Sequence, residues 1–248
     1  MKFVSVVPVL FVVVALSSTA HAQTVWLDVG AKGGVGGNYL SPPDDFAFSN
    51  VAAFPFEDGA GGLGGGGGIF ADVRFLKQYL GLEVGFLFEG NKNWCSITYN
   101  DVVDVDYIYR YSKMRIPILL KGSVVRNKTR VSLGIGPEIQ AGLGSSADIE
   151  VTDGEQYVSD ADVQDLKSAF RTSDRTDVAL AFDFGVAIGI AKLALTIDFR
   201  LAYNLSMPSA YDERVGDYTT GTFNTEAAST LDGRILVGLA YGFAFGDK

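Results

Sequence analysis

The chain of 248 residues has few of the side chains that carry most enzyme chemistry. It contains one histidine, His21, and one cysteine, Cys95. A lone cysteine excludes a disulfide within the chain. His21 lies in a segment that we expect to be cleaved, so the mature chain can build neither a Ser-His-Asp triad nor a histidine zinc site. We therefore predict a protein that is not an enzyme and that holds no metal and no cofactor.

Long apolar runs are scarce too, and the longest one stands at the N-terminus. Lys2 precedes an apolar stretch at 3–16, and Ala20-His21-Ala22 follows it as an A-x-A cleavage site. This order is typical of a secretory signal peptide, and the run is shorter than the ~20 residues that a membrane-spanning helix needs. We expect residues 1–22 to be removed and residues 23–248 to form a single domain.

Basic residues are in deficit. Without Lys2 the mature chain has 19 Lys+Arg against 29 Asp+Glu, a net charge of −10. Such an acidic chain is a poor candidate for binding nucleic acid. The run at 59–68, GAGGLGGGGG, contains G-x-G-x-x-G, but the segment that follows it alternates as a strand does, whereas a dinucleotide site needs a helix there. We predict no nucleotide, and we interpret the run as a flexible loop that leads into a strand, with room beside it for Phe70.

The signal that is present in abundance is alternation of apolar and polar residues with a period of two, which marks strands. It predicts eight strands at about 24–36, 64–76, 79–90, 107–122, 128–143, 180–190, 193–205 and 234–245. Short turns alternate with long loops, which we place at 37–63, 91–106, 144–176 and 206–230. This layout is that of bacterial outer-membrane barrels. We predict an all-β, eight-stranded, antiparallel up-and-down transmembrane barrel with short periplasmic turns and long extracellular loops, located in the Gram-negative outer membrane.

The two faces of these strands differ in character. One face is rich in Phe, Leu, Ile and Val, and we expect it to contact lipid, because an eight-stranded lumen is narrow and filled by its own side chains. The other face carries equal numbers of acids and bases that could pair inside the barrel. The predicted lumen charge network comprises Asp28, Lys32, Asp72, Arg74, Glu83, Glu89, Arg115, Lys121, Arg130, Glu138, Asp183, Asp198, Arg200 and Arg234. The structural alternative is a soluble periplasmic barrel of the lipocalin type, with the apolar face inside.

Three stretches carry a family resemblance. YSKMRIPILLKG (111–122) resembles the proline-containing fourth strand of PorT-type outer-membrane barrels, within the broad OmpA-like class. GIGPEIQAGL (134–143) resembles the Gly-Pro strand that follows it, and DADVQDLKSAF (160–170) fits a loop segment of that family. The resemblance implies the same barrel fold, and it suggests a part in protein secretion or envelope assembly.

The expected loops are strongly acidic, with a net charge of −14 against +4 for the rest of the mature chain. Asp101, Asp104 and Asp106 could hold a divalent cation, but we interpret them as solvated loop charges. Residues 159–171 predict a short helix capped by Ser159 or Asp160. We predict a plugged barrel with a structural or surface-recognition role, surrounded by outer-membrane lipid and with a surface or periplasmic protein as candidate partner. The alternatives are a narrow pore for small solutes, the soluble ligand-binding barrel, and the secretion component.

Overall fold

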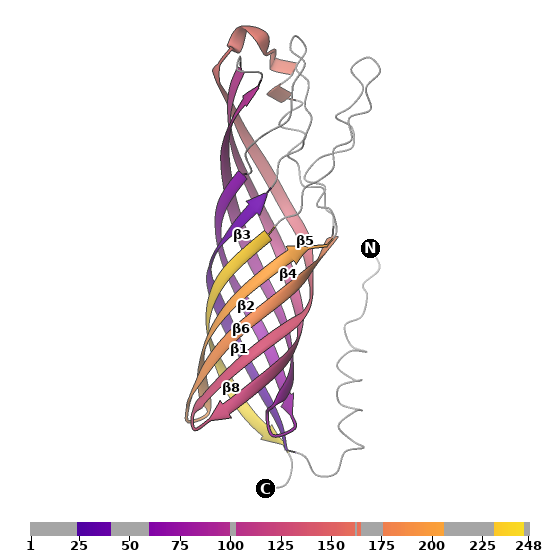
Figure 1. Cartoon of the computed structure of the whole chain (residues 1–248), viewed down its shortest axis with the longest axis vertical. Coiled ribbons are helices and arrows are strands. Elements are labelled where there is room, and N and C mark those ends of the chain that lie inside the picture. Colours follow the sequence, from indigo (N-terminus) through magenta and orange to yellow (C-terminus); the bar gives the residue numbers. More distant parts are fainter. Residues whose placement is uncertain are drawn as a thin grey trace.

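The protein is a closed barrel of eight antiparallel strands (Figure 1). The computed structural model describes residues 24–40, 60–99, 103–161, 163–164, 176–205 and 231–245; the predicted signal peptide and the loop at 206–230 lie outside these ranges. The strands are β1 (Val25–Leu40), β2 (Ala60–Phe75), β3 (Leu80–Tyr99), β4 (Val103–Arg126), β5 (Thr129–Asp153), β6 (Thr176–Ile190), β7 (Leu193–Asn204) and β8 (Leu231–Phe245).

The strands follow one another around the barrel in sequence order, and β8 closes it by pairing with β1 from Val25–Phe245 onward. Tight turns join β2 to β3, β4 to β5 and β6 to β7 at one end. Several residues in these turns have positive φ angles, among them Asn127 and Ala191, as tight reversals require. The predicted up-and-down fold is therefore confirmed. No helix among the described residues is long and apolar enough to cross a membrane.

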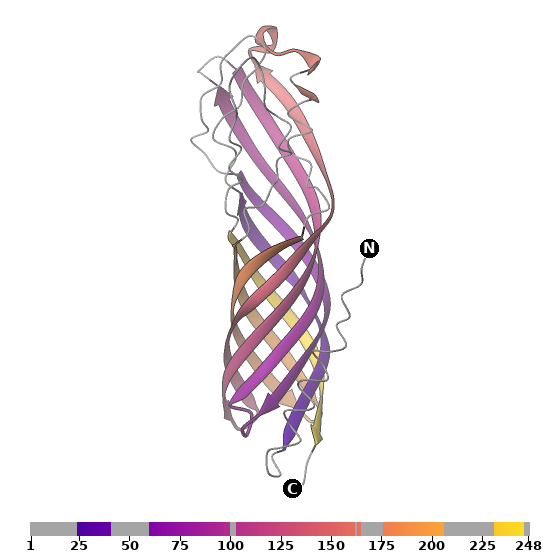
Figure 2. The same cartoon turned by 90° about the vertical axis from the view of Figure 1, so that its right-hand side faces the viewer.

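Parts of three of the expected loops are strand, and there the prediction was wrong: 37–40 and 60–63 belong to β1 and β2. Residues 91–99 extend β3, 103–106 begin β4, and 144–153 extend β5. Figures 1 and 2 show β3, β4 and β5 rising above the ends of the other strands. The sequence VDVDYIYRY at 103–111 keeps the strand alternation through this region, with Val and Tyr on the inward side and Asp, Ile and Arg on the outward side.

Beyond β5 the chain forms a short 3-10 helix, Glu155–Tyr157. The predicted helix at 159–171 begins as expected: residues 160, 161, 163 and 164 are helical, and the N–H of Val163 donates to the carbonyl of Ser159 at 3.2 Å. The remainder of that helix, from 165, lies outside the described residues.

The glycine run belongs to a strand: the predicted strand at 64–76 is confirmed, and 61–63, which we expected in the flexible loop, are strand as well. Gly61–Gly68 belong to β2 and pair with the glycine-rich part of β1, with Gly33 opposite Gly67 and Gly34 opposite Gly66. The inward glycines have a steric reason, since a Cβ on Gly66 would lie 2.0 Å from the carbonyl oxygen of Phe88 on β3. Such close backbone approach accompanies a sharply curved sheet. Phe70, at the end of the run, points into the barrel and is buried.

The two mid-strand prolines lie where strand pairing is interrupted. Pairing of β3 with β4 passes from Val84–Ile118 directly to Leu87–Arg115, beside Pro117. Pairing of β4 with β5 passes from Pro117–Glu138 to Leu120–Ile135, beside Pro137. Proline lacks the N–H that a ladder needs, so these interruptions accommodate both rings inside long strands.

The large apolar side chains face outward. Phe182, Phe184 and Phe199 are each nearly half exposed, as are the alternate positions along β7 and β8. The inward positions between them are mostly small, polar or charged residues, and most of them are buried. A soluble barrel of the lipocalin type would place the apolar face inside, so this arrangement favours contact with lipid.

Candidate functional site in the barrel interior

The fourteen charged residues expected in the lumen all lie on the inward face. Twelve are buried, and Glu89 and Arg130 are partly buried. Their ion pairs form three groups stacked along the barrel, here called the lower, central and upper clusters, with the lower one nearest the tight turns. Each group joins strands that are far apart in sequence.

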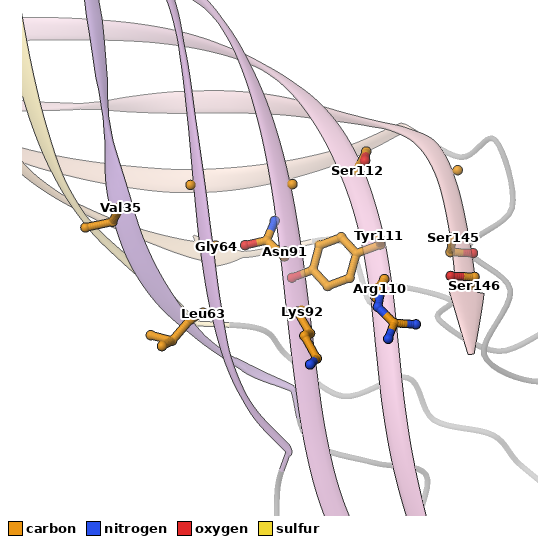
Figure 3. Close-up of a pocket in the computed structure, with 13 residues that line it drawn as sticks. Val35, Leu63, Gly64, Asn91, Lys92, Arg110, Tyr111, Ser112, Ser145 and Ser146 are labelled. Atoms are coloured by element: carbon orange, nitrogen blue, oxygen red, sulfur yellow. The ribbon is translucent and has the colours of Figure 1, made fainter. Parts of the chain in front are cut away.

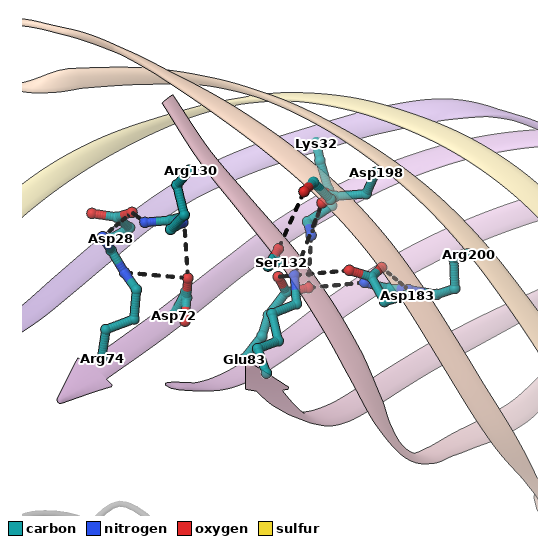
Figure 4. Close-up of polar contacts among 12 residues, drawn as sticks. Asp28, Lys32, Asp72, Arg74, Glu83, Arg130, Ser132, Asp183, Asp198 and Arg200 are labelled. Atoms are coloured by element: carbon teal, nitrogen blue, oxygen red, sulfur yellow. Dashed lines mark hydrogen bonds and ion pairs between the residues drawn. The ribbon is translucent and has the colours of Figure 1, made fainter. Parts of the chain in front are cut away.

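The lower cluster contains Asp28, Asp72, Arg74 and Arg130 (Figure 4). Asp28 and Asp72 are directly opposite each other on β1 and β2. Like charges in this position repel each other. Arg74 pairs with both carboxylates, and so does Arg130, whose guanidinium lies 3.1 Å from Asp28 and 3.3 Å from Asp72. The two arginines therefore compensate a repulsive pair of acids.

The central cluster is built around Glu83 (Figure 4). Its carboxylate accepts from Lys32 at 2.6 Å, from Lys121 at 2.6 Å and from Arg200 at 2.9 Å. Asp183 and Asp198 complete the group: Asp183 contacts Lys121 and Arg200, and Asp198 contacts Lys32 and, at 3.9 Å, Lys121. The ammonium of Lys32 also lies 4.2 Å from the ring centroid of Phe70. Every charge in this cluster has at least two partners.

The upper cluster is built around Arg115, which is completely buried. Arg115 contacts Glu89, Glu138 at 2.8 Å and Asp232 at 3.0 Å. Arg234 contacts the same three carboxylates, each at 3.4 Å. Two guanidinium groups thus share three acids at the level where β8 begins.

Two members of the upper cluster were missed by sequence reasoning. Asp232 is buried on β8, two residues before Arg234, and Lys113 on β4 donates to Gln140 at 3.3 Å. Both fit the period-two alternation that the sequence shows. Lys113 stands between Tyr111 and Arg115 on the inward face of β4, and Asp232 lies on the same face of β8 as Arg234. With them the named inward charges number eight acids and eight bases, and Asp177 on β6, in register with the buried Gln140, is a further partly buried acid on the same face.

Above the upper cluster the inward side chains become uncharged. Asn38 donates to Asn93 at 3.0 Å and to the hydroxyl of Tyr111 at 2.5 Å. Tyr107 and Tyr109 continue this buried row on β4. The lumen therefore changes from ion pairs to amide and phenol groups as it approaches the extended ends of β3, β4 and β5.

Within the described ranges, no group of three or more His, Cys, Asp and Glu side chains is placed to hold a metal ion. Of the three aspartates considered for a cation, Asp101 lies outside the described residues. Asp104 and Asp106 lie on the outward side of β4.

The fold and the interior define the class of protein: a small transmembrane β-barrel with an apolar exterior and a charged, paired lumen. The chain belongs to the outer membrane protein beta-barrel domain family, whose model matches residues 9–243. It is a protein of the Gram-negative outer membrane.

Several solved structures are similar to this chain. Neisserial surface protein A is 12% identical, with 88% of this chain and 97% of that one covered and a TM-score of 0.35. Ail of Yersinia pestis, solved with the heparin analogue sucrose octasulfate, is 10% identical over 90% and 99%, with a TM-score of 0.31. The Escherichia coli outer-membrane protease OmpT is 10% identical over 92% and 100%, with a TM-score of 0.37. No curated protein sequence matches the chain.

Proposed function

We propose that the protein is a non-enzymatic outer-membrane barrel whose lumen is plugged by its own ion pairs, with a structural or surface-recognition role. The observation that carries the proposal is the balanced set of sixteen buried or partly buried charges, stacked in three clusters across an eight-stranded lumen. An eight-stranded barrel has an interior just wide enough for its side chains. Paired charges that fill this interior leave no continuous path for ions.

The remaining interior space supports the same proposal. A cavity between the lower and central clusters, lined in part by Phe70, Asp72 and Thr196, has a volume of about 10 Å³. This is about the volume that a single water requires. A cavity of this size is too small to be a conducting path at this level of the barrel.

Planar-bilayer recording with the purified full-length protein tests the plug. We expect no stable single-channel steps, since no charge can leave its partners without leaving them unpaired in the lumen. A matched variant, Arg110→Gln, changes an exposed arginine outside the lumen and should be equally silent. Reproducible unitary steps from the unmodified protein would instead favour the narrow-pore alternative.

Recognition at the surface is the proposed role of the acidic part of the chain. The extended strands present Asp104, Asp106, Asp148 and Glu150 outward beyond the apolar exterior, next to loops that are acidic in sequence. Charge of one sign on a projecting surface steers association with partners of opposite charge. A cationic surface partner is therefore the expected kind. A pull-down of the cationic partner by intact cells tests this proposal. Loss of capture after neutralising these four acids supports the proposal, and unchanged capture eliminates it.

A second candidate function follows from the PorT-type resemblance. Two of its stretches, 111–122 and 134–143, lie on β4 and β5 and pair with each other through Pro117 and Glu138. We therefore keep a part in secretion or envelope assembly as a proposal. A deletion strain with an unchanged set of secreted and outer-membrane proteins would eliminate it.

A further inference from the structure

The outer wall of the barrel carries a hollow that the interior network does not explain. It has a volume of about 730 Å³ and crosses β1 to β5 at one level of strand pairing (Figure 3). Val35 and Leu63 line it on β1 and β2, and both are more than 60% exposed. Lys92 and Arg110 line it on β3 and β4, while Gly90 and Ser112 lie directly opposite each other one pairing step below them.

The hollow exists because small residues occupy outward positions where larger ones would fit. A Cβ on Gly90 would meet no atom within 4 Å, and one on Gly65 would come no closer than 3.3 Å to a neighbour. The inward glycines differ, since a Cβ on Gly64 would lie 2.0 Å from Asn91. Close packing against neighbouring strands therefore explains why the inward residues are glycine. The outward Gly90 has no such steric reason.

The level of this groove in the membrane follows from the outward side chains of β3. From the tight turn upward they are Leu82, Val84, Phe86 and Phe88, then Gly90, then Lys92 and Trp94. The tight turns mark the periplasmic end, so the change from apolar to basic falls at the outer surface of the membrane. Tryptophan is typical of this interface. The groove lies where the acyl chains of the outer leaflet meet their headgroups.

The two basic residues above the groove stand directly opposite each other on neighbouring strands, Lys92 facing Arg110. Like charges in this position repel each other. Arg110 is partly compensated by an exposed ion pair with Asp148. In the part of the chain that the structure describes, Lys92 makes no ion pair. An anion held above Gly90 and Ser112 would relieve this repulsion.

We propose that this groove binds one lipid of the outer leaflet through a phosphate in its headgroup. The phosphate contacts Lys92 and Arg110, and an acyl chain lies along the shallow surface made by Val35, Leu63 and Gly90. The small outward residues make room for the chain, and the charge of the basic pair complements that of the phosphate. This site is independent of the plugged lumen.

Native mass spectrometry of the full-length protein in detergent tests the proposal, with phosphatidylglycerol as the probe and diacylglycerol as its uncharged counterpart. We expect one retained phosphatidylglycerol per barrel and no retained diacylglycerol. Lys92→Gln should weaken retention about fivefold, which corresponds to about 1 kcal/mol for one basic residue near a lipid surface. Lys128→Gln, the same change in a periplasmic turn, should have no effect.

A second pair of variants separates the groove from the charge. Gly90→Leu fills the hollow, whereas Gly122→Leu adds the same side chain to an outward position near the periplasmic end that is equally free of neighbours. We expect only Gly90→Leu to abolish retention, with both variants showing the heat-dependent gel shift of a folded barrel. Retention that is unchanged in both Lys92→Gln and Gly90→Leu would overturn the proposal. So would a protein dimer that Gly90→Leu disrupts, because the groove would then bind a second copy of the chain.

Discussion

At the scale of single residues, the charges of the three clusters are tolerable only because nearly all of them have two or more partners of opposite charge. A buried ion pair is weak evidence for stability, since desolvation offsets most of the attraction between its members. Removing one member is different, because the remaining charges stay buried without compensation. Arg115 is the sharpest case: its side chain is fully buried and contacts three carboxylates from β3, β5 and β8.

Replacement of Arg115 by methionine should therefore destabilise the barrel strongly. Met keeps much of the volume and leaves Glu89, Glu138 and Asp232 with a deficit of positive charge. We expect the free energy of unfolding to fall by about 3–5 kcal/mol. Urea titration of the protein refolded into lipid vesicles, followed by tryptophan fluorescence, measures this value.

The control for that variant is Arg110→Met on the same strand. Arg110 makes one ion pair, with Asp148, and the two side chains are 46% and 65% exposed. Exposed pairs contribute about 0–1 kcal/mol, so the control should unfold close to the unmodified protein. Equal losses in the two variants would show that the interior pairing is not what makes Arg115 important.

At the scale of strands, the glycines of β1 and β2 fall into two classes that the sequence does not distinguish. In the run at 61–68 every residue except Leu63 is glycine, yet a Cβ would lie within 2.5 Å of another atom only at the inward ones, whereas at the outward Gly65 and Gly67 the nearest atom is 3.0 Å or more away. Composition indicated a flexible loop as far as Leu63, and the structure shows a paired strand there instead. The missing information was long-range: which carbonyl on β3 or β8 would meet an added Cβ.

Two single alanine substitutions at neighbouring positions test this distinction. Gly66→Ala drives a methyl group to within 2.0 Å of the Phe88 carbonyl, so we expect a loss of about 1–3 kcal/mol in the free energy of unfolding. Gly90→Ala, close by on β3, adds a methyl group into open space and should be neutral or stabilising by about 0.5 kcal/mol. Vesicle-refolded protein titrated with urea gives both values. A neutral Gly66→Ala would mean that β2 and β3 are not held as closely as the structure has them.

The alternation of apolar and polar residues along β4 and β5 predicted these strands correctly where we relied on it. Where acidic residues occupied outward positions, we predicted loops, and this was wrong. Asp104 and Asp106 suggested a loop, although Val103, Val105 and Tyr107 kept the inward period of two. Outward acids are compatible with a strand once it has left the apolar layer. The inward residues of such an extension are the better guide, because they pack whether or not lipid surrounds the outer face.

At the scale of the whole molecule, the fold and most of the lumen were predictable from the sequence because both depend on one repeated rule. Alternation assigned fourteen charges to the interior, and those it missed, among them Lys113 and Asp232, obey the same rule. Alternation could not give the grouping into three clusters. Strand register decides that Arg115 meets Asp232, 117 positions away, and register depends on the closure of the barrel.

The apolar exterior predicts that outward positions along one strand lie at different depths in the membrane, and this can be tested on β7. On β7, Ile197 lies near the middle of the outward row and Leu193 lies beside the tight turn at Ala191. An arginine on the lipid-facing side costs about 2–4 kcal/mol at the midplane and about 0–1 kcal/mol near an interface. Ile197→Arg should therefore destabilise the vesicle-embedded protein several times more than Leu193→Arg in a urea titration. A similar small loss for both would indicate that β7 faces water or another protein chain, and lipid contact would then be confined to the other strands.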